Sequence, residues 1–336
     1  MVPIPTRARA GAIPRSTLEP TVGRWLWTCR EGFETHLYEE LAWAKVSPRL
    51  LGPTLVESES MRGDPPVFAR MGFRVERLAK AVDEVSFPAG PVFVQAWVPD
   101  STLANGWSSE AADWERTLRE ARTDSPENPW KAWEANALLG QVCLVAPRLA
   151  AVGHVPARQA LSLASGGRTR MKRTSEAPSR AAMKLDEAVE WYGVSPGRGD
   201  LCVDLGSAPG GWTRRLLERG ARVWSVDPAN LAPDVAKHGK VRHFKESAFQ
   251  FEPAEPVDWL FCDMAWRPLE VAQLIAKWGR RGWATQVISN IKLPMKDKLP
   301  MLVRVRATLQ DAGWQHIRIR QLYHDRDEVT LSARKR

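Results

Sequence analysis

The sequence lacks the marks of several common protein classes. Its 336 residues include four cysteines, none in a CxxC pair, which argues against zinc ribbons and dithiol redox sites. No apolar run approaches the ~18 residues of a transmembrane helix. Residues 1–20 contain arginines and prolines but no apolar core of a secretory signal. We therefore expect a monomeric cytoplasmic protein with reduced cysteines, no metal centre and no membrane span.

Acidic residues are the minority. The chain has 48 Lys and Arg against 39 Asp and Glu, for a net charge of +9. This excess favours a polyanionic partner such as RNA, although a generally basic surface has the same composition. The length suits two domains.

The N-terminal part is predicted to be a disordered tail (residues 1–22) and one α/β domain (residues 23–157). Strand patterns at 25–30, 91–98 and 141–147 alternate with helical patterns at 31–45 and 111–121, which predicts a mixed sheet covered by helices. This region is rich in tryptophan. Such side chains can stack on nucleobases, but their apolar character favours core positions.

A basic segment, residues 158–180, follows this domain. The segment contains a single acid, Glu176. Five of its cations are candidates for phosphate contacts: Arg168, Arg170, Lys172, Arg173 and Arg180. The one-sided charge favours an arm that follows an RNA backbone over a plain solvated linker.

Residues 181–336 show a regular alternation of strands and helices. Strands are predicted at 201–205, 222–226, 240–244, 257–262, 285–291, 316–322 and 329–333, and helices at 213–219, 269–277 and 298–312. This pattern predicts a doubly wound, mostly parallel sheet of Rossmann-like type. The last two strands are too close in sequence for a crossover helix, so they pair antiparallel.

The turn after the first of these strands is rich in glycine but is neither GxGxxG nor a P-loop. Its residues are Gly206, Ser207, Ala208, Pro209, Gly210, Gly211 and Trp212. The next strand ends in Asp227, where a carboxylate can accept hydrogen bonds from both hydroxyls of a ribose. A nucleoside without phosphates on a glycine-rich turn predicts the adenosyl group of S-adenosylmethionine.

Two lysines and two acids converge on the carboxyl edge of the predicted sheet. Asp263 and Lys292 end two parallel strands, Glu328 begins the antiparallel strand, and Lys184 begins a helix before the first strand. Ligands of open α/β sheets bind at this edge. Each residue taken alone is more often a surface charge, but the set predicts a catalytic site.

This set can activate a hydroxyl group toward methylation. A free lysine is mostly protonated at neutral pH, and nearby positive charges favour its neutral form. A second lysine and the cofactor sulfonium would supply such charges. We expect Lys292 to be the base, Lys184 and Asp263 to orient the reactants, and Glu328 to support them. In-line positioning supplies the rest of the rate.

These motifs carry a family resemblance. Residues 181–336 resemble the FtsJ-type ribose 2′-O-methyltransferases, whose Lys-Asp-Lys-Glu tetrad matches Lys184, Asp263, Lys292 and Glu328, and whose cofactor motif resembles LGSAPGGW. The resemblance implies S-adenosylmethionine-dependent methylation of an RNA ribose 2′-hydroxyl.

More specific strings, SRAAMKLDEA, IKLPMK and QLYHDRDEVT, are similar to family members that methylate a cytidine in 23S rRNA and carry an N-terminal RNA-binding THUMP module. CREGFETHLYEEL and VAPRLAAVGHV resemble the start and the end of that module. One position departs from the family: Ser247, with Glu246 beside it, stands where relatives have an acid near the adenine.

Other functions stay open at this point. The same chemistry on another RNA is the nearest alternative. A non-catalytic RNA-binding factor of ribosome assembly would have no need of the tetrad, and a nicotinamide oxidoreductase would need GxGxxG.

Overall fold

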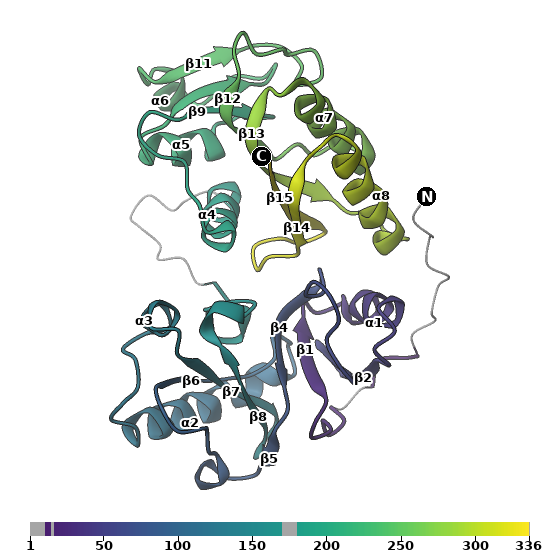
Figure 1. The fold of residues 1–336 in the computed structure, drawn as a ribbon, viewed down its shortest axis with the longest axis vertical. Helices are drawn as coiled ribbons and strands as arrows, with labels where there is room; N and C mark the ends of the chain where they lie inside the picture. Colours follow the sequence, from purple (N-terminus) through teal and green to yellow (C-terminus); the bar gives the residue numbers. More distant parts are fainter. Residues whose placement is uncertain (1–10, 15–16, 170–179, 336) are drawn as a thin grey trace. The chain divides into compact units, whose positions relative to one another are not determined.

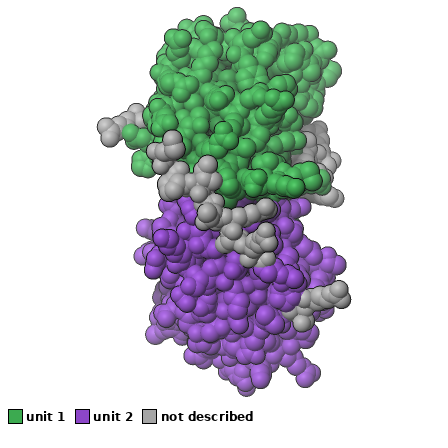
Figure 2. Space-filling view, turned by 90° about the vertical axis from the view of Figure 1, so that its right-hand side faces the viewer, with its two compact units in different colours: residues 1–4, 171–336 green, residues 5–170 purple. Residues whose placement is uncertain are grey.

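The computed structural model describes residues 11–14, 17–169 and 180–335. The chain divides into two compact units, one containing residues 5–170 and the other residues 171–336 together with residues 1–4 (Figure 2). Each unit is described by itself below.

The N-terminal unit contains two four-stranded sheets rather than the single mixed sheet predicted from sequence (Figure 1). The first has the order β2-β3-β1-β4 with all neighbours antiparallel. Its strands are β1 (Trp25–Cys29), β2 (Arg49–Gly52), β3 (Leu55–Ser58) and β4 (Ala69–Arg74). The second has the order β5-β8-β7-β6, in which only β6 and β7 are parallel. Its strands are β5 (Arg77–Ala79), β6 (Val92–Trp97), β7 (Leu138–Ala146) and β8 (Leu149–Pro156).

Helices of this unit bury one face each. They are α1 (Glu34–Trp43), α2 (Ser108–Glu120) and α3 (Pro129–Glu134), with short 3₁₀ turns η1 (Val82–Glu84), η2 (Ala104–Trp107), η3 (Ala157–Gln159) and η4 (Ser165–Gly167). Helix α3 begins where Asn128 accepts a hydrogen bond from the Lys131 amide and proline takes the first helical position, where its missing N–H costs nothing. The tryptophans divide: Trp27, Trp97 and Trp114 are core, whereas Trp43, Trp130 and Trp133 are exposed.

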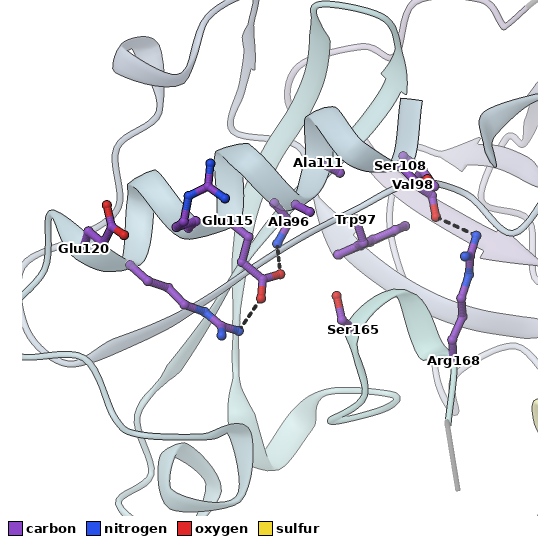
Figure 3. A pocket seen from close by; sticks show the side chains of 12 residues that line it. Ala96, Trp97, Val98, Ser108, Ala111, Glu115, Glu120, Ser165 and Arg168 are labelled. Carbon is purple, nitrogen blue, oxygen red and sulfur yellow. Dashed lines mark hydrogen bonds and ion pairs between the residues drawn. The ribbon is translucent and has the colours of Figure 1, made fainter. Parts of the chain in front are cut away.

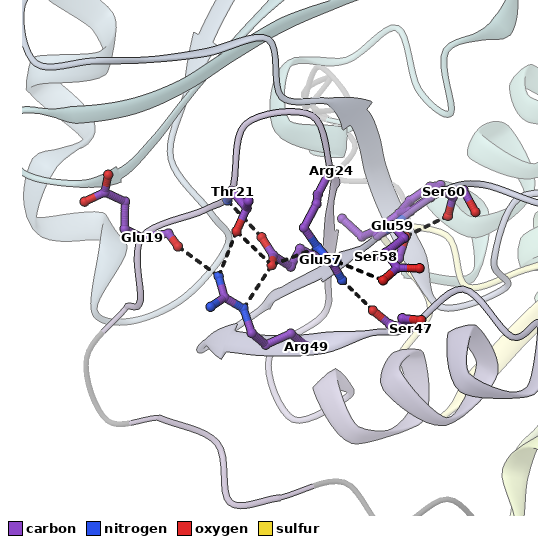
Figure 4. Close-up of polar contacts among 10 residues, drawn as sticks. Glu19, Thr21, Arg24, Ser47, Arg49, Glu57, Ser58, Glu59 and Ser60 are labelled. Carbon is purple, nitrogen blue, oxygen red and sulfur yellow. Dashed lines mark hydrogen bonds and ion pairs between the residues drawn. The ribbon is translucent and has the colours of Figure 1, made fainter.

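A buried acid in β3 is one reason why the sequence did not predict the first sheet. Glu57 of β3 is 2% exposed and accepts hydrogen bonds or ion pairs from Thr21, Arg24 and Arg49 (Figure 4). A buried carboxylate needs such partners. The acid interrupts the apolar pattern by which a strand is recognised in a sequence. Its partners come from other parts of the chain, so the sequence does not show that the acid is satisfied when buried.

Residues near both ends of this unit make contacts with it. In the predicted tail, the Leu18 amide donates to the Leu51 carbonyl and Thr21 binds Glu57. In the predicted linker, η3 and η4 lie within the compact unit, which extends to residue 170.

The C-terminal unit is the predicted doubly wound sheet. Its seven strands have the order β11-β10-β9-β12-β13-β15-β14, and β15 alone runs antiparallel to its neighbours. The strands are β9 (Leu201–Leu205), β10 (Arg222–Val226), β11 (Val241–Phe244), β12 (Val257–Cys262), β13 (Ala284–Lys292), β14 (Gln315–Arg320) and β15 (Glu328–Arg334). The order reverses between β9 and β12, which is where such sheets bind ligands.

Helices cover both faces of this sheet. They are α4 (Arg180–Tyr192), α5 (Gly211–Glu218), α6 (Pro233–Ala236), α7 (Pro268–Arg281) and α8 (Lys298–Asp311). In Figure 1, α4, α5 and α6 lie on one side of the sheet and α7 and α8 on the other. Leu185 and Ala188 of α4 pack with Trp212, Trp259 and Phe261 in the core.

The four cysteines are free and buried. Among the described helices, none has both the length and the apolar character for crossing a membrane. Within the same described part of the chain, no group of His, Cys, Asp and Glu could hold a metal ion.

Candidate active site

The glycine-rich turn lies between β9 and α5, at the carboxyl edge of the sheet. Gly206 has φ +76° and Gly210, which precedes α5, has φ +112°. Both values lie in the left-handed region that favours glycine. A β-carbon on Gly206 would come within 2.6 Å of the Met264 side chain, and one on Gly210 would come within 3.1 Å of Val235. The sequence therefore needs glycine at both positions.

Asp227 at the end of β10 is tied to this turn. One carboxylate oxygen accepts the Ala208 amide at 3.1 Å and the other accepts the Ala229 amide at 2.8 Å. These two bonds fix the plane of the carboxylate. Each oxygen keeps a further lone pair, because a carboxylate has about four acceptor sites.

The turn presents polar groups for a ligand. The Ser207 hydroxyl is buried and has no hydrogen-bond partner among the described residues. An unsatisfied buried hydroxyl is unusual, and beside a turn without side chains at 206 and 210 it fits a bound polar ligand. This loop therefore fits a nucleoside with a small polar tail.

Two predicted cofactor residues have other contacts. The Trp212 side chain is 3% exposed and donates from Nε1 to the Ala181 carbonyl at 2.8 Å, so it fastens α4 to α5 from within the core. The Ser247 hydroxyl accepts the Phe249 amide at 3.3 Å in the turn after β11.

Three of the four tetrad residues form one ion-pair cluster. Lys184 Nζ lies 2.5 Å from Glu328 Oε1 and 3.7 Å from Asp263 Oδ1. Their side chains are 11%, 11% and 23% exposed. Helix α4 thus places its lysine between the end of β12 and the start of β15, which sequence alone could not determine.

The cluster shifts the protonation of two of its members. Burial disfavours the charged form of Lys184, but the charges of Asp263 and Glu328 outweigh burial and raise its pKa above the ordinary value. Burial also raises the pKa of Asp263, against the opposing effect of Lys184. The raised pKa of Lys184 favours its charged form, which suits a residue that orients its neighbours.

The fourth member, Lys292, lies outside this ion-pair cluster. It ends β13 directly opposite Glu328 in the antiparallel register and its side chain is exposed. In the described part of the chain it makes no ion pair within 4.0 Å. The structure thus gives the two lysines different environments at one sheet edge.

Sequence analysis missed a residue that holds this cluster together. Glu187, one turn after Lys184 on α4, accepts the amides of Tyr323 at 2.7 Å and His324 at 2.9 Å. It fastens α4 to the β14–β15 connection that leads into Glu328. An acid on the buried side of an amphipathic helix was the available signal.

The predicted basic arm is only partly described. Arg170, Lys172 and Arg173 lie outside the described residues, and of Arg180 only its place at the start of α4 is described. Arg168 is 15% exposed, donates to the Val98 and Pro99 carbonyls, and pairs with Asp100. It lines a pocket of about 620 Å³ beside α2, together with Trp97 and Glu115 (Figure 3). Arg168 is therefore anchored in the N-terminal unit.

The chain is similar to several known proteins. A family described as FtsJ-like methyltransferase matches residues 177–286. The ribosomal RNA large subunit methyltransferase M of Laribacter hongkongensis is 42% identical over 49% of this chain and 50% of its own length. The protein of the same name from Xylella fastidiosa strain M12 is 32% identical over 91% of this chain and 97% of its own length. The solved structure of Aeropyrum pernix fibrillarin with bound S-adenosyl-L-methionine covers 46% of this chain and 76% of its own, at 23% identity and TM-score 0.37.

The C-terminal unit is thus an FtsJ-like methyltransferase domain of Rossmann-like fold. Some relatives match over only about half of their length, whereas others match over nearly all of it. The chain belongs to the ribosomal RNA large subunit methyltransferase M family. The family resemblance seen in the sequence is confirmed.

Proposed function

We propose that this protein transfers a methyl group from S-adenosylmethionine to a ribose 2′-hydroxyl of large-subunit ribosomal RNA, a cytidine of 23S rRNA. The observation that supports it most is the tetrad: a largely buried Lys184–Asp263–Glu328 cluster with Lys292 free beside it. A purely RNA-binding protein has no use for two largely buried acids around a lysine at a sheet edge, since burying charges costs free energy.

The chain would hold the cofactor at the carboxyl edge of β9, β10 and β12. The turn from Gly206 to Gly211 would admit the methionine part close to the backbone, and Asp227 would accept the ribose hydroxyls. Ser247 or Glu246 would contact the adenine. When bound, the cofactor supplies an electrophilic methyl group on a positively charged sulfur.

The protein's own groups would manage the proton. The four tetrad charges sum to zero when both lysines are protonated and both acids ionised. Adding a cation to this edge favours loss of a proton from the lysine that has no carboxylate partner, which is Lys292. Lys292 would accept the proton of the ribose hydroxyl, while Lys184 stays charged and orients the reactants with Asp263. Positioning supplies the remaining acceleration.

The N-terminal unit would recognise the RNA. Its extent, residues 5–170, and its two four-stranded sheets with their helices suit an RNA-binding domain of the THUMP-like kind that the sequence suggests. The cations at Arg170, Lys172, Arg173 and Arg180 would contact phosphates on the way to the catalytic domain.

One experiment tests the function as a whole. Ribose methylations of rRNA are mapped in cells with and without the gene, and in deletion cells complemented by the Lys292→Ala variant. We expect one 2′-O-methylcytidine of 23S rRNA to disappear on deletion and to return with the wild-type gene only. An unchanged map would reject the enzyme. A map restored by Lys292→Ala would favour a non-catalytic role in ribosome assembly.

A further inference from the structure

A chain of buried polar groups leads from the catalytic acid into the sheet. Asn290 donates from Nδ2 to Asp263 Oδ1 at 3.2 Å, the same oxygen that faces Lys184. The Asn290 amide oxygen lies 3.1 Å from the Thr330 hydroxyl, which lies 3.0 Å from Asp325 Oδ2. The side chains of Asn290, Thr330 and Asp325 are buried.

The strand register places these polar groups next to the tetrad. Asn290 and Thr330 are partners across β13 and β15, and Lys292 and Glu328 are partners two residues further along. Side chains two residues apart on a strand point to the same face. The inner pair therefore supports the outer, catalytic pair on one face of the sheet.

The chemistry of these groups decides which of them donates in each hydrogen bond. A threonine hydroxyl has one proton, so it cannot donate to both Asn290 and Asp325. The amide oxygen of Asn290 can only accept, so its contact with Thr330 needs the hydroxyl proton, while Asp325 Oδ2 also accepts the Leu322 amide at 2.9 Å. Thr330 then donates to the Asn290 oxygen, which leaves the Asn290 amide protons facing Asp263.

We propose that Asn290 and Thr330 are positioning residues, which orient the Asp263 carboxylate for the methyl-transfer reaction without touching the substrate. This inference rests on the proposed function. With the amide of Asn290 turned the other way, its oxygen would face the Asp263 carboxylate, and both would lose a hydrogen bond. The Thr330 hydroxyl prevents that rotation.

The test compares Thr330→Val, which removes the hydroxyl, with Thr330→Ser, which keeps it. Rates of single-turnover methyl transfer are measured on rRNA, together with affinity for S-adenosylhomocysteine and thermal unfolding. We expect Thr330→Val to slow the transfer by at least tenfold and up to roughly 100-fold, the size of effect that a small misplacement causes. Cofactor affinity should change less than about threefold, and Thr330→Ser should stay within about threefold of wild type in rate. Asn290→Ala provides the same test if Thr330→Val does not fold.

Two results would overturn the inference. In the first, Thr330→Val and Thr330→Ser transfer the methyl group at equal rates. In the second, both variants lose rate in proportion to their loss of thermal stability. An inactive wild type would instead reject the proposed function. In that case an NMR titration of Asp263 still tests the positioning role; the charged groups that act on Asp263 are Lys184, Glu328 and Asp204, the last a buried acid of β9. The loss of an oriented donor in Thr330→Val should raise the Asp263 pKa, and an unchanged titration would reject a positioning role.

Discussion

Removing the positive charge of Lys184 should expose how much the catalytic cluster depends on it. In Lys184→Met a side chain of similar length remains, but Asp263 and Glu328 lose their common cation. Breaking a buried ion pair by removing one partner costs about 3–5 kcal/mol. Because the three side chains are 11–23% exposed, we expect the lower end, about 3 kcal/mol. For a domain of this size that is roughly 6–12 °C in Tm.

The pH dependence of this loss gives a sharper test. In the wild type the raised pKa of Lys184 means that its stabilisation is present in full below about 10.5, its ordinary value, and disappears only as pH rises through the folded value. In the variant, Asp263 loses the cation that opposes its raised pKa. A folded acid with a raised pKa binds protons that the unfolded chain does not, so stability recovers as pH falls. The loss should therefore be smaller at pH 5 than at pH 8.

The assay is calorimetric unfolding of the full chain at both pH values. Lys277→Met is the matched control, since Lys277 pairs with Glu252 at 2.9 Å on the exposed side of the same unit, where ion pairs contribute little. A Tm of Lys184→Met equal to that of the control, or a loss that does not change with pH, would refute the reasoning.

Three further outcomes are expected. Lys292→Arg should fold and bind S-adenosylhomocysteine but transfer no methyl group, because arginine keeps the charge and cannot release its proton; near-normal transfer of labelled methyl to rRNA would leave the lysine a structural role. Asp227→Ala should abolish S-adenosylhomocysteine binding in calorimetry, because the ribose hydroxyls lose their acceptor; unchanged affinity would place the cofactor elsewhere. Neutralising Arg170, Lys172 and Arg173 together should flatten the slope of log affinity for RNA against log salt by roughly 0.7–0.9 for each lost phosphate contact; an unchanged slope would make the segment a plain connection.

The C-terminal sheet could be predicted almost to the residue, for a physical reason. Its central parallel strands are buried on both faces, so they appear as short apolar runs, and β9, β10 and β12 begin and end where the sequence predicted. Asp227 and Asp263 directly follow the runs of β10 and β12. Because parallel strands end at the same edge of the sheet, the sequence could place both acids at that edge. The antiparallel place of β15 followed from the short connection before it.

The N-terminal unit was harder because polar residues are buried inside its strands. Glu57 in β3 and Arg70 in β4 are each 2% exposed, and both interrupt the apolar alternation that marks a strand. Their partners, Arg24 and Asp100 among them, are separated from them by dozens of residues. Asn290 was overlooked for the same reason: its partners lie on other elements, and one asparagine in an apolar strand shows nothing of them.

The contact between Gly206 and Met264 links two functions that are usually discussed apart. Gly206 belongs to the loop proposed for the cofactor, and Met264 follows Asp263 of the tetrad, yet a β-carbon added to Gly206 would lie 2.6 Å from the Met264 side chain. A side chain at position 206 would therefore press on the segment that directly follows Asp263. An engineered side chain at position 206 would thus call for a smaller residue at position 264 in the same variant.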